Sequence, residues 1–439
     1  MAHLDSRGLP MTTASAEAAR LYRDGVDLLI SAWPGAVETL KQAVEADPDF
    51  ALAHAALARL HAIRAEPAEA RAAIARASDC AARHGTLRER SHVATLALAI
   101  SGQGRKALES ALSHADSWPR DVIILSLPLG AFGLFAFSGM ADHDRARVEL
   151  CERHARHFDA SDWWFLTYRG WSHAENGAVT LGRDLAERAL ELRRANANGA
   201  HALSHAMFEQ GAGQDAEALI TDWLPSYDRA GILHGHIAWH AALSALERGD
   251  AAAAFAIYDQ YIKPSVSLGV PLNVVTDAVS LLWRIQAYGH DVPASRWEPV
   301  KAYSCTKFPA PGLSFADVHM GLLAAATGDR RDAADRIDAL TRLAEEGSVA
   351  AGPVVPAICR AALAFADEDY AGCVRILEPL AGEIVRIGGS GAQREVIEDT
   401  LLLALLRSGQ AMGARDLLDK RLHRRPSSRD AGWRKQIAT

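Results

Sequence analysis

Cysteine is scarce in this chain, and its five occurrences are scattered. They include no C-x-x-C pair, and they stand at Cys80, Cys151, Cys305, Cys359 and Cys373. An odd number of unpaired cysteines is typical of a reducing compartment rather than of a disulfide framework, so we expect a cytoplasmic protein. The beginning of the sequence also lacks a basic segment followed by a continuous apolar stretch, so we expect no secretory signal.

Long apolar runs and an excess of positive charge are missing as well. The longest apolar stretch, residues 122–137, is interrupted by Pro128 and two glycines and is too short to cross a bilayer comfortably. The formal net charge of -7 offers no attraction to nucleic-acid phosphates or anionic lipid. The most basic run, residues 420–425, precedes Pro426 and is interpreted as a solvated helix terminus. We therefore expect neither a nucleic-acid partner nor a membrane span.

Alternating stretches of Val, Ile and Thr are nearly absent, which argues against a sheet-rich fold. Alanine and leucine instead run through most segments, and both favour helices. Hydrophobic residues make up 49% of the 439 residues and charged residues 23%, which is enough to form a core and remain in solution. The composition predicts an all-α protein.

A short pattern of alanine, a large apolar residue four positions later, and a proline beyond recurs along the chain. It occurs at Ala36–Pro48, returns without the proline at Ala70–Ala77, and appears again at Ala414–Pro426. The first two occurrences are 70 - 36 = 34 residues apart, which is the tetratricopeptide period. Small residues let the two helices of a hairpin approach closely, and large ones fill the gap between them. We therefore expect helical hairpins stacked into a solenoid.

Tight breaks between further helix pairs are predicted wherever glycine clusters with Ser, Asn or Asp, for example at Gly102–Gly104 and Gly211–Gly213. We expect N-terminal repeats over residues 1–180 and C-terminal repeats over residues 181–439, continuous as one right-handed superhelix curled around a concave pocket. Three longer irregular stretches are predicted to wall that pocket, namely Pro264–Pro271, Gly289–Pro311 and Ile387–Gly391.

Two histidine pairs carry the clearest chemical signal. His201 and His205 are four residues apart, as are His236 and His240, so each pair projects from one face of its helix. Neutral imidazoles at this spacing are suited to zinc or iron, and two pairs could share one ion. The alternative is that these are buried histidines that join helices by hydrogen bonds. Neither pair has the Glu of the H-E-x-x-H arrangement found in zinc proteases.

Three further constellations are candidates. Asp277 and Arg284 share a helical stripe with Ser280, although such a pair is more often a structural ion pair. Residues 315–319 include Asp317 and His319. The glycine turn at 388–391 opens a helix whose free N-H groups could hold a carboxylate, or whose Ser390 could simply be its N-cap. This turn has neither the Lys-Ser/Thr of a Walker loop nor the preceding strand of a dinucleotide site, so no nucleotide cofactor is expected.

On these motifs the chain resembles the tetratricopeptide repeat protein 38 family along nearly its whole length. The segments that carry the resemblance are Asp47–His54, Leu87–His92, Pro119–Asp121, His201–His205, His236–His240, Asp277–Arg284, Phe315–His319 and Gly388–Arg394. Two positions depart from the family pattern. Phe208 stands where an acid is usual, with Glu209 displaced by one, and Ala316 stands where Asn is usual. The resemblance implies a helical-repeat architecture with His201 and His205 on its concave face.

A signature that fixes His, Asp, Trp, Gln and Arg on separate helices points to a pocket more than to a variable docking groove. The predicted catalytic residues are His201, His205, His240, Asp277 and His319. The predicted ligand-binding residues are His54, His236, Trp239, Arg284, Asp317, Ser390, Gln393 and Arg394. The predicted metal ligands are His201, His205, His236 and His240.

Two functions therefore stand side by side. In the first, a small polar or carboxylated ligand is held by Arg394 and the glycine turn, and histidine and aspartate perform hydrolytic or lyase-type acid-base chemistry with a bound zinc or iron. In the second, the solenoid is a non-catalytic scaffold for a peptide or a partner protein. The identity of the ligand and the oligomeric state, a homodimer included, stay open at this point.

Overall fold

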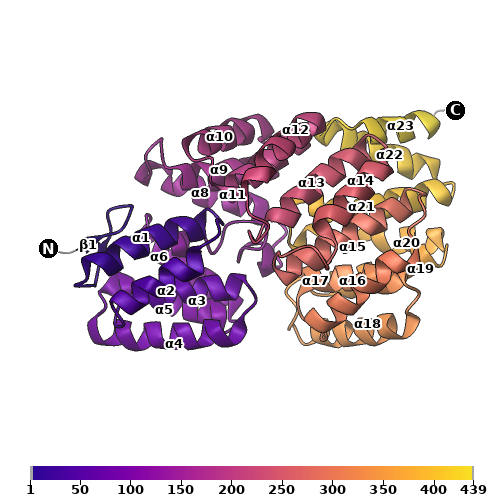
Figure 1. Cartoon of the computed structure of the whole chain (residues 1–439). Coiled ribbons are helices and arrows are strands. Elements are labelled where there is room, and N and C mark those ends of the chain that lie inside the picture. The colour runs from indigo at the N-terminus through magenta and orange to yellow at the C-terminus, as the bar shows by residue number, and fades with distance from the viewer. Residues whose placement is uncertain (1–2, 438–439) are drawn as a thin grey trace.

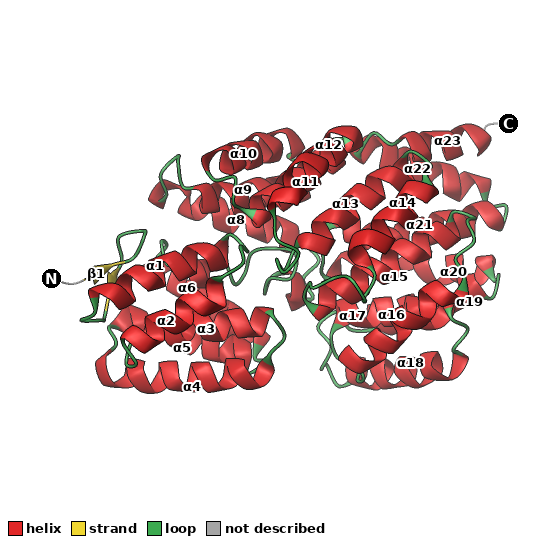
Figure 2. Ribbon diagram, in the orientation of Figure 1, coloured by secondary structure: helices red, strands yellow, loops and turns green. Residues whose placement is uncertain are grey.

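The computed structural model describes residues 3–437, and nearly all of its regular structure is helical (Figures 1 and 2). The described strands are β1 (His3–Leu4) and β2 (Pro10–Met11), which form one antiparallel pair with His3 opposite Met11. This short hairpin lies at the N-terminal end beside the first helix. The expected all-α helical solenoid is confirmed.

Helices α1 to α12 form the first part of the chain. They are α1 (Ala16–Ile30), α2 (Ala36–Ala46), α3 (Ala51–Ile63), α4 (Pro67–His84), α5 (Leu87–Ile100), α6 (Gly104–Ser117), α7 (Val122–Leu125), α8 (His143–His154), α9 (Trp163–Glu175), α10 (Val179–Leu192), α11 (Ala197–Glu209) and α12 (Gly213–Trp223).

Helices α13 to α23 form the rest. They are α13 (His234–Glu247), α14 (Ala251–Ile257), α15 (Pro271–Ala287), α16 (Ala294–Lys307), α17 (Ser314–Ala326), α18 (Arg330–Glu345), α19 (Val354–Ala366), α20 (Tyr370–Leu377), α21 (Gly391–Arg407), α22 (Ala411–Arg424) and α23 (Ser428–Ile437). Short 3-10 or π turns are η1 (Ala136–Ser138), η2 (Ala155–His157), η3 (Leu224–Ser226), η4 (Tyr258–Ile262), η5 (Glu378–Leu380) and η6 (Ile384–Ile387).

Neighbouring helices pack in pairs, as the repeat pattern predicts. The three residues of the first pattern, Ala36, Leu40 and Ala43, are all buried on α2. Helices α9 and α10 approach so closely that a Cβ on Gly182 would lie 2.6 Å from the backbone nitrogen of Ala174. A larger residue at position 182 would therefore push this hairpin apart.

The prediction of an irregular stretch over residues 289–311 is wrong for the middle of that range. Helix α16 occupies Ala294–Lys307, and Pro299 lies inside it. The helix persists because Trp297 and Val300 are buried against the core, and this burial outweighs the backbone hydrogen bond that proline removes. The other two predicted irregular stretches lie between helices.

The interpretation of residues 420–425 as a solvated terminus holds for Lys420 and Arg424, which are exposed, but is wrong for Arg421 and Arg425. Arg421 is 2% exposed and contacts three carboxylates, with its guanidinium 2.7 Å from Asp430, 2.8 Å from Asp399 and 3.1 Å from Glu395. Arg425 is equally buried and lies 2.6 Å from Glu395. The basic run therefore neutralises acids inside the C-terminal repeats.

The solenoid curls until segments far apart in sequence meet. The Gly389 N-H donates to the carbonyl of Ala131 over 3.2 Å, and His143 Nε2 donates to the carbonyl of Val385 over 3.0 Å. The apolar core forms three clusters, within residues 11–165, within 171–241 together with Ala32, and within 208–418. The division of the chain at residue 180 stays a prediction.

No helix within residues 3–437 is long and apolar enough to cross a membrane.

Candidate functional site

Helices α11 and α13 bring the two histidine pairs together. His205 Nε2 lies 3.0 Å from His201 Nε2, and His236 Nε2 lies 3.0 Å from the same atom. The rings of His205 and His240 are 4.3 Å apart between centroids. One nitrogen from each of the four imidazoles falls within 4.8 Å of the others. We call His201, His205, His236 and His240 the four-histidine cluster.

Local sequence explains why the pairs converge. Asn196 caps α11 by accepting the Gly199 N-H, which fixes where that helix begins. The spacing of four residues then places the second histidine of each pair directly above the first. Since α11 and α13 pack side by side, the two histidine rows face each other.

Carboxylates stand on the outer side of the cluster. His236 Nδ1 lies 2.9 Å and 3.0 Å from the two oxygens of Asp277 on α15. His205 Nδ1 lies 2.9 Å from Glu175 Oε1 at the end of α9, although the angle there is not that of a hydrogen bond. A carboxylate on Nδ1 leaves the lone pair of Nε2 directed inward, as in carboxylate-histidine-metal triads.

The electrostatics of the cluster favour neutral imidazoles at His201 and His240. Burial, followed by the charge of neighbouring histidines, holds the pKa values of His201 and His240 well below their usual range. Burial raises the pKa of Asp277, and His236 opposes this shift. Burial likewise disfavours ionisation of Glu175, but the neighbouring His205 outweighs it and lowers the pKa of that carboxyl. Neutral imidazoles are the form that binds metals.

The hydrogen-bonding capacity of the cluster is not met within the protein. Both nitrogens of His240 are buried and have no hydrogen-bond partner among the described residues. Leaving a buried polar group unpaired costs about 1 to 3 kcal/mol. Tetrahedral ligation at zinc-nitrogen distances of 2.0 to 2.1 Å puts ligand nitrogens about 3.3 Å apart; the pairs His201–His205 and His201–His236 are at 3.0 Å, and all four nitrogens lie within 4.8 Å. The donor set therefore fits a divalent cation.

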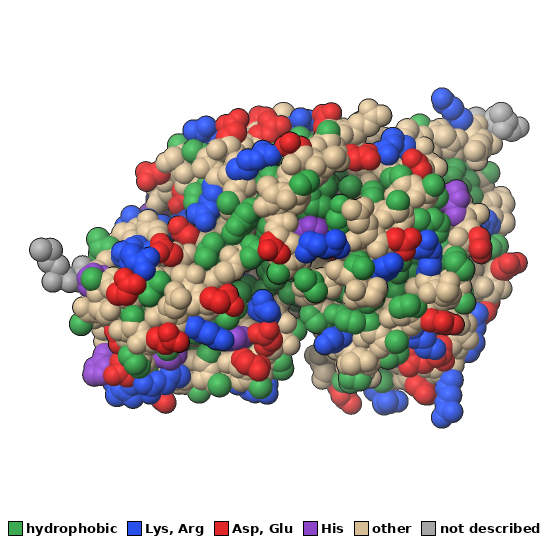
Figure 3. Space-filling model, in the orientation of Figure 1, with side chains coloured by type: hydrophobic (Ala, Val, Ile, Leu, Met, Phe, Trp, Pro, Cys, Tyr) green, Lys and Arg blue, Asp and Glu red, His purple; other side chains and the backbone are tan. Residues whose placement is uncertain are grey.

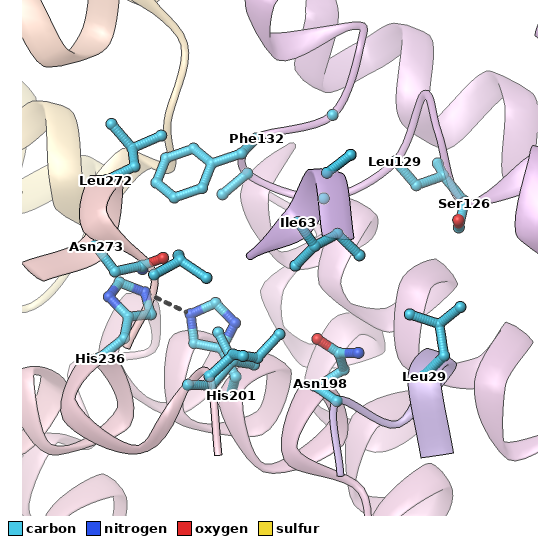
Figure 4. Close-up of a pocket in the computed structure, with 18 of the residues that line it drawn as sticks. Leu29, Ile63, Ser126, Leu129, Phe132, Asn198, His201, His236, Leu272 and Asn273 are labelled. Carbon is cyan, nitrogen blue, oxygen red and sulfur yellow. Dashed lines mark hydrogen bonds between the residues drawn. The ribbon is translucent and has the colours of Figure 1, made fainter. Parts of the chain in front are cut away.

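A cavity of about 530 Å³ adjoins the cluster (Figure 4). His201 and His236 lie at one side of it, with Asn273 next to His236, whereas Ile63, Leu129 and Phe132 from the first part of the chain face them. The volume is in the range of small-molecule sites. Figure 3 shows hydrophobic side chains gathered in the hollow between the two halves of the molecule. The lining is mostly apolar, unlike the polar pocket expected from the sequence.

Three other predicted residues lie away from the cavity lining. Trp239 stacks on His236 with ring centroids 5.5 Å apart, and the guanidinium of Arg284 lies 5.7 Å from the Trp239 ring. Arg284 also contacts Asp399 at 3.2 Å. These two residues support the cluster from outside. His319 Nδ1 donates to the carbonyl of Phe315 over 2.8 Å, and burial with the charge of Arg284 lowers the pKa of His319 to about 4.

Two predicted ligand-binding residues lie elsewhere. His54 Nε2 donates to the carbonyl of Pro48 over 2.9 Å within the N-terminal repeats. Asp317 accepts from Arg336 over 2.6 Å and from the Gly312 N-H over 2.8 Å. The structure does not bring either residue to the cavity.

The glycine turn and its helix hold the chain's own carboxylates instead of a ligand. Ser390 and Gln393 form a reciprocal cap at the start of α21, and both are buried. The Gly391 N-H donates to Glu175 over 2.7 Å, and the Arg394 guanidinium lies 2.9 Å from Asp144. The anion expected at this helix terminus is thus Glu175, which links the turn to His205.

Sequence reasoning missed Glu175 and most of the cavity lining. Glu175 ends α9 just before the Asn176-Gly177 break and has no motif around it. Glu209, the displaced acid of the first histidine helix, lies near Glu175; burial first, and then the charge of Glu175, raises its pKa to about 7. Contacts between helices bring these acids together, so Glu175 could not be found from spacing along the chain, whereas Glu209 was visible there as the displaced acid.

No family model matches this sequence. Among solved structures, a complex of Naa15/Naa10 bound to HypK-THB shares 13% identity and covers 93% of this chain, with a TM-score of 0.22. The chain spans 63% of the length of that structure. The TPR domain of P58(IPK) shares 13% identity over 90% of this chain and 99% of that domain, with a TM-score of 0.20.

The fold and the site define an all-α solenoid of helical hairpins with a histidine cluster beside a cavity. Membership of the tetratricopeptide repeat protein 38 family stays a prediction.

Proposed function

We propose that this chain is a metal-dependent ligand-processing protein built on a helical-repeat scaffold. In this proposal His201, His205, His236 and His240 hold one zinc or iron ion, and the adjoining cavity holds the ligand. His201 and His236 belong both to the cluster and to the cavity lining, so the ion and the ligand share a boundary.

The chemistry that suits this arrangement is hydrolysis or proton transfer. An ion held by the four imidazoles would need a fifth coordination position open to the cavity, where it would lower the pKa of a bound water and polarise a carbonyl oxygen. Asp277 and Glu175 orient two of the imidazoles, and Asn273 offers an amide at the cavity wall. All five described cysteines are free, and no nucleotide motif stands in the sequence, so redox chemistry has less support.

The observation that carries the proposal is the convergence of four imidazoles, three buried and that of His201 half-buried, whose nitrogens face one another. Histidines that only join helices donate to carbonyl or carboxylate oxygens, as His54 does. In the four-histidine cluster the carboxylates lie on the outside and nitrogens face nitrogens in the middle.

Metal analysis of the purified chain tests the proposal. We expect about one zinc or iron per chain, lost in His205→Gln. The metal-loaded protein should also gain thermal stability over the chelator-treated protein, because a cation that binds only the native state raises its apparent stability. With 4-nitrophenyl esters of increasing chain length as probes, hydrolysis should follow the metal content.

His234→Gln is the matched control, because His234 is buried on the same helix but lies outside the cluster. It should keep the metal. A metal-free wild-type chain whose melting temperature does not respond to added zinc or iron would refute the proposal.

A protein-docking scaffold is the second candidate. The observation in its favour is the architecture, since stacked helical hairpins offer extended concave surfaces. Fold alone is a weak argument for function. A chain that neither holds metal nor hydrolyses the ester probes would leave the scaffold as the better description.

A further inference from the structure

Arg59 is a cation without a counterion on the wall of the cavity. It lies on α3, four residues before Ile63, so both side chains project from one face of that helix, and both line the cavity. Arg59 has neither a hydrogen bond nor an ion pair with any residue from 3 to 437. Among the described residues, the hydroxyl of Tyr168 on α9 interacts electrostatically with Arg59.

The other buried arginines of this chain are paired. Arg88 lies 2.8 Å from Asp121, and Arg284 and Arg421 contact Asp399 at 3.2 Å and 2.8 Å. A guanidinium cannot lose its proton, so a buried one needs an anion. Burial lowers the pKa of Arg59, yet some of its surface remains accessible because it faces the cavity. The half-buried guanidinium of Arg59 therefore faces the cavity with no carboxylate of the described residues beside it.

The charged side chains of the lining have the same sign. They are Arg59 and the exposed Lys307, and among the described lining residues there is no Asp or Glu. The positive charge of the lining contrasts with the formal net charge of the whole chain, which is -7. The rest of the lining is chiefly apolar, from Leu29 and Ile63 on one side to Leu272 and Phe308 on the other.

We propose that the cavity binds an amphipathic anion, an apolar chain with one carboxylate or phosphate head, and that Arg59 holds the head. Arg59 comes from the N-terminal repeats, whereas the four-histidine cluster comes from α11 and α13, so the ligand bridges the two. The inference rests on the proposed function in that it names the ligand class of the same cavity. The bidentate geometry of a guanidinium suits either anionic head.

Binding of twelve-carbon probes tests this. Calorimetry should show that dodecanoate or dodecyl phosphate binds at least 10-fold more tightly than dodecanol, and the tighter of the two anions identifies the head. Loss of a charge-assisted hydrogen bond weakens binding by roughly 10- to 100-fold, so Arg59→Gln should lose that much affinity for the anion and little for dodecanol. Arg59→Lys should recover part of the loss.

Arg64→Gln is the control, because Arg64 follows the same helix but is exposed and pairs with Glu66. It should bind like the wild type. Dodecanol or dodecyltrimethylammonium binding as tightly as the anions, or an unchanged affinity in Arg59→Gln, would overturn the inference.

Metal content separates the two proposals. Arg59→Gln should keep its metal, and His205→Gln should keep most of its affinity for the anion. If a chain that takes up no zinc or iron still bound the anion, this inference would stand and the metal proposal would fail. If a chain that holds the metal did not bind the anion, the metal proposal would stand and this inference would fail.

Discussion

Two buried clusters of histidine and carboxylate lie in different parts of this chain and are built in opposite ways. In the N-terminal repeats, Asp121 accepts from Arg88 over 2.8 Å, from His92 over 3.0 Å and from His114 over 3.2 Å. We call these four residues the Asp121 cluster. Its centre is an anion, surrounded by donors. In the four-histidine cluster the anions are outside, and the centre consists of imidazole nitrogens.

This difference decides which cluster suits a cation. Burial disfavours ionisation of Asp121, but His92, His114 and Arg88 outweigh it and hold the pKa of that carboxyl well below its usual range. Arg88 already supplies a positive charge, so a metal ion there would meet a cation. No arginine or lysine is paired with the four-histidine cluster among the described residues. Residue types alone do not separate the two clusters; their arrangement does.

The largest expected effect comes from breaking the Asp121 cluster. Asp121→Asn leaves the buried Arg88 without its counterion, which should lower the free energy of unfolding by about 3 to 5 kcal/mol. Urea denaturation measures this. Asp116→Asn is the control, because Asp116 is exposed and should change stability by less than about 0.5 kcal/mol. If Asp121→Asn changed stability by as little as the control, the anion would not be structural, and metal binding there would need testing.

A smaller effect is expected from the outer carboxylate of the four-histidine cluster. Asp277→Asn keeps the shape but weakens the hold on His236 Nδ1, so metal affinity should fall by roughly 10- to 100-fold. Competition with a chromophoric chelator measures the affinity. Asp259→Asn, which removes ion pairs with Arg296 and Lys263 outside the cluster, should leave the metal affinity unchanged. Equal affinities in the two variants would mean that Asp277 orients no metal ligand.

The smallest effect is a pH dependence at Glu209, which tests whether Glu175 stays ionised. Burial first, and then the charge of Glu175, raises the pKa of Glu209 from 4.5 to about 7. A carboxyl with a raised pKa stabilises the fold at low pH, and this contribution is lost as the pH rises from about 4.5 through about 7. Glu209→Gln should therefore be more stable than the wild type at pH 8 and equal to it near pH 4. Thermal melts across this range measure the difference, and parallel pH profiles would contradict it.

Much of the fold follows from local pattern. The 34-residue repeat predicts the hairpins because Ala36, Leu40 and their equivalents need only neighbouring helices for burial. Local pattern fails at Pro299, because helix α16 continues through this proline where Trp297 packs against a distant core. It also fails to predict the burial of Arg421, because the partner of Arg421, Asp399, comes from a separate helix.

The candidate site divides in the same way. The sequence determined the two histidine pairs, because a spacing of four residues places both imidazoles on one face of any helix. Only the tertiary structure decided that the two rows meet, that Glu175 and Asp277 stand behind them, and that the glycine turn receives Glu175 rather than a ligand. It also decided that Arg59 faces an internal cavity without a counterion. These features depend on contacts between helices far apart in the chain, and the packing of the curled solenoid sets them.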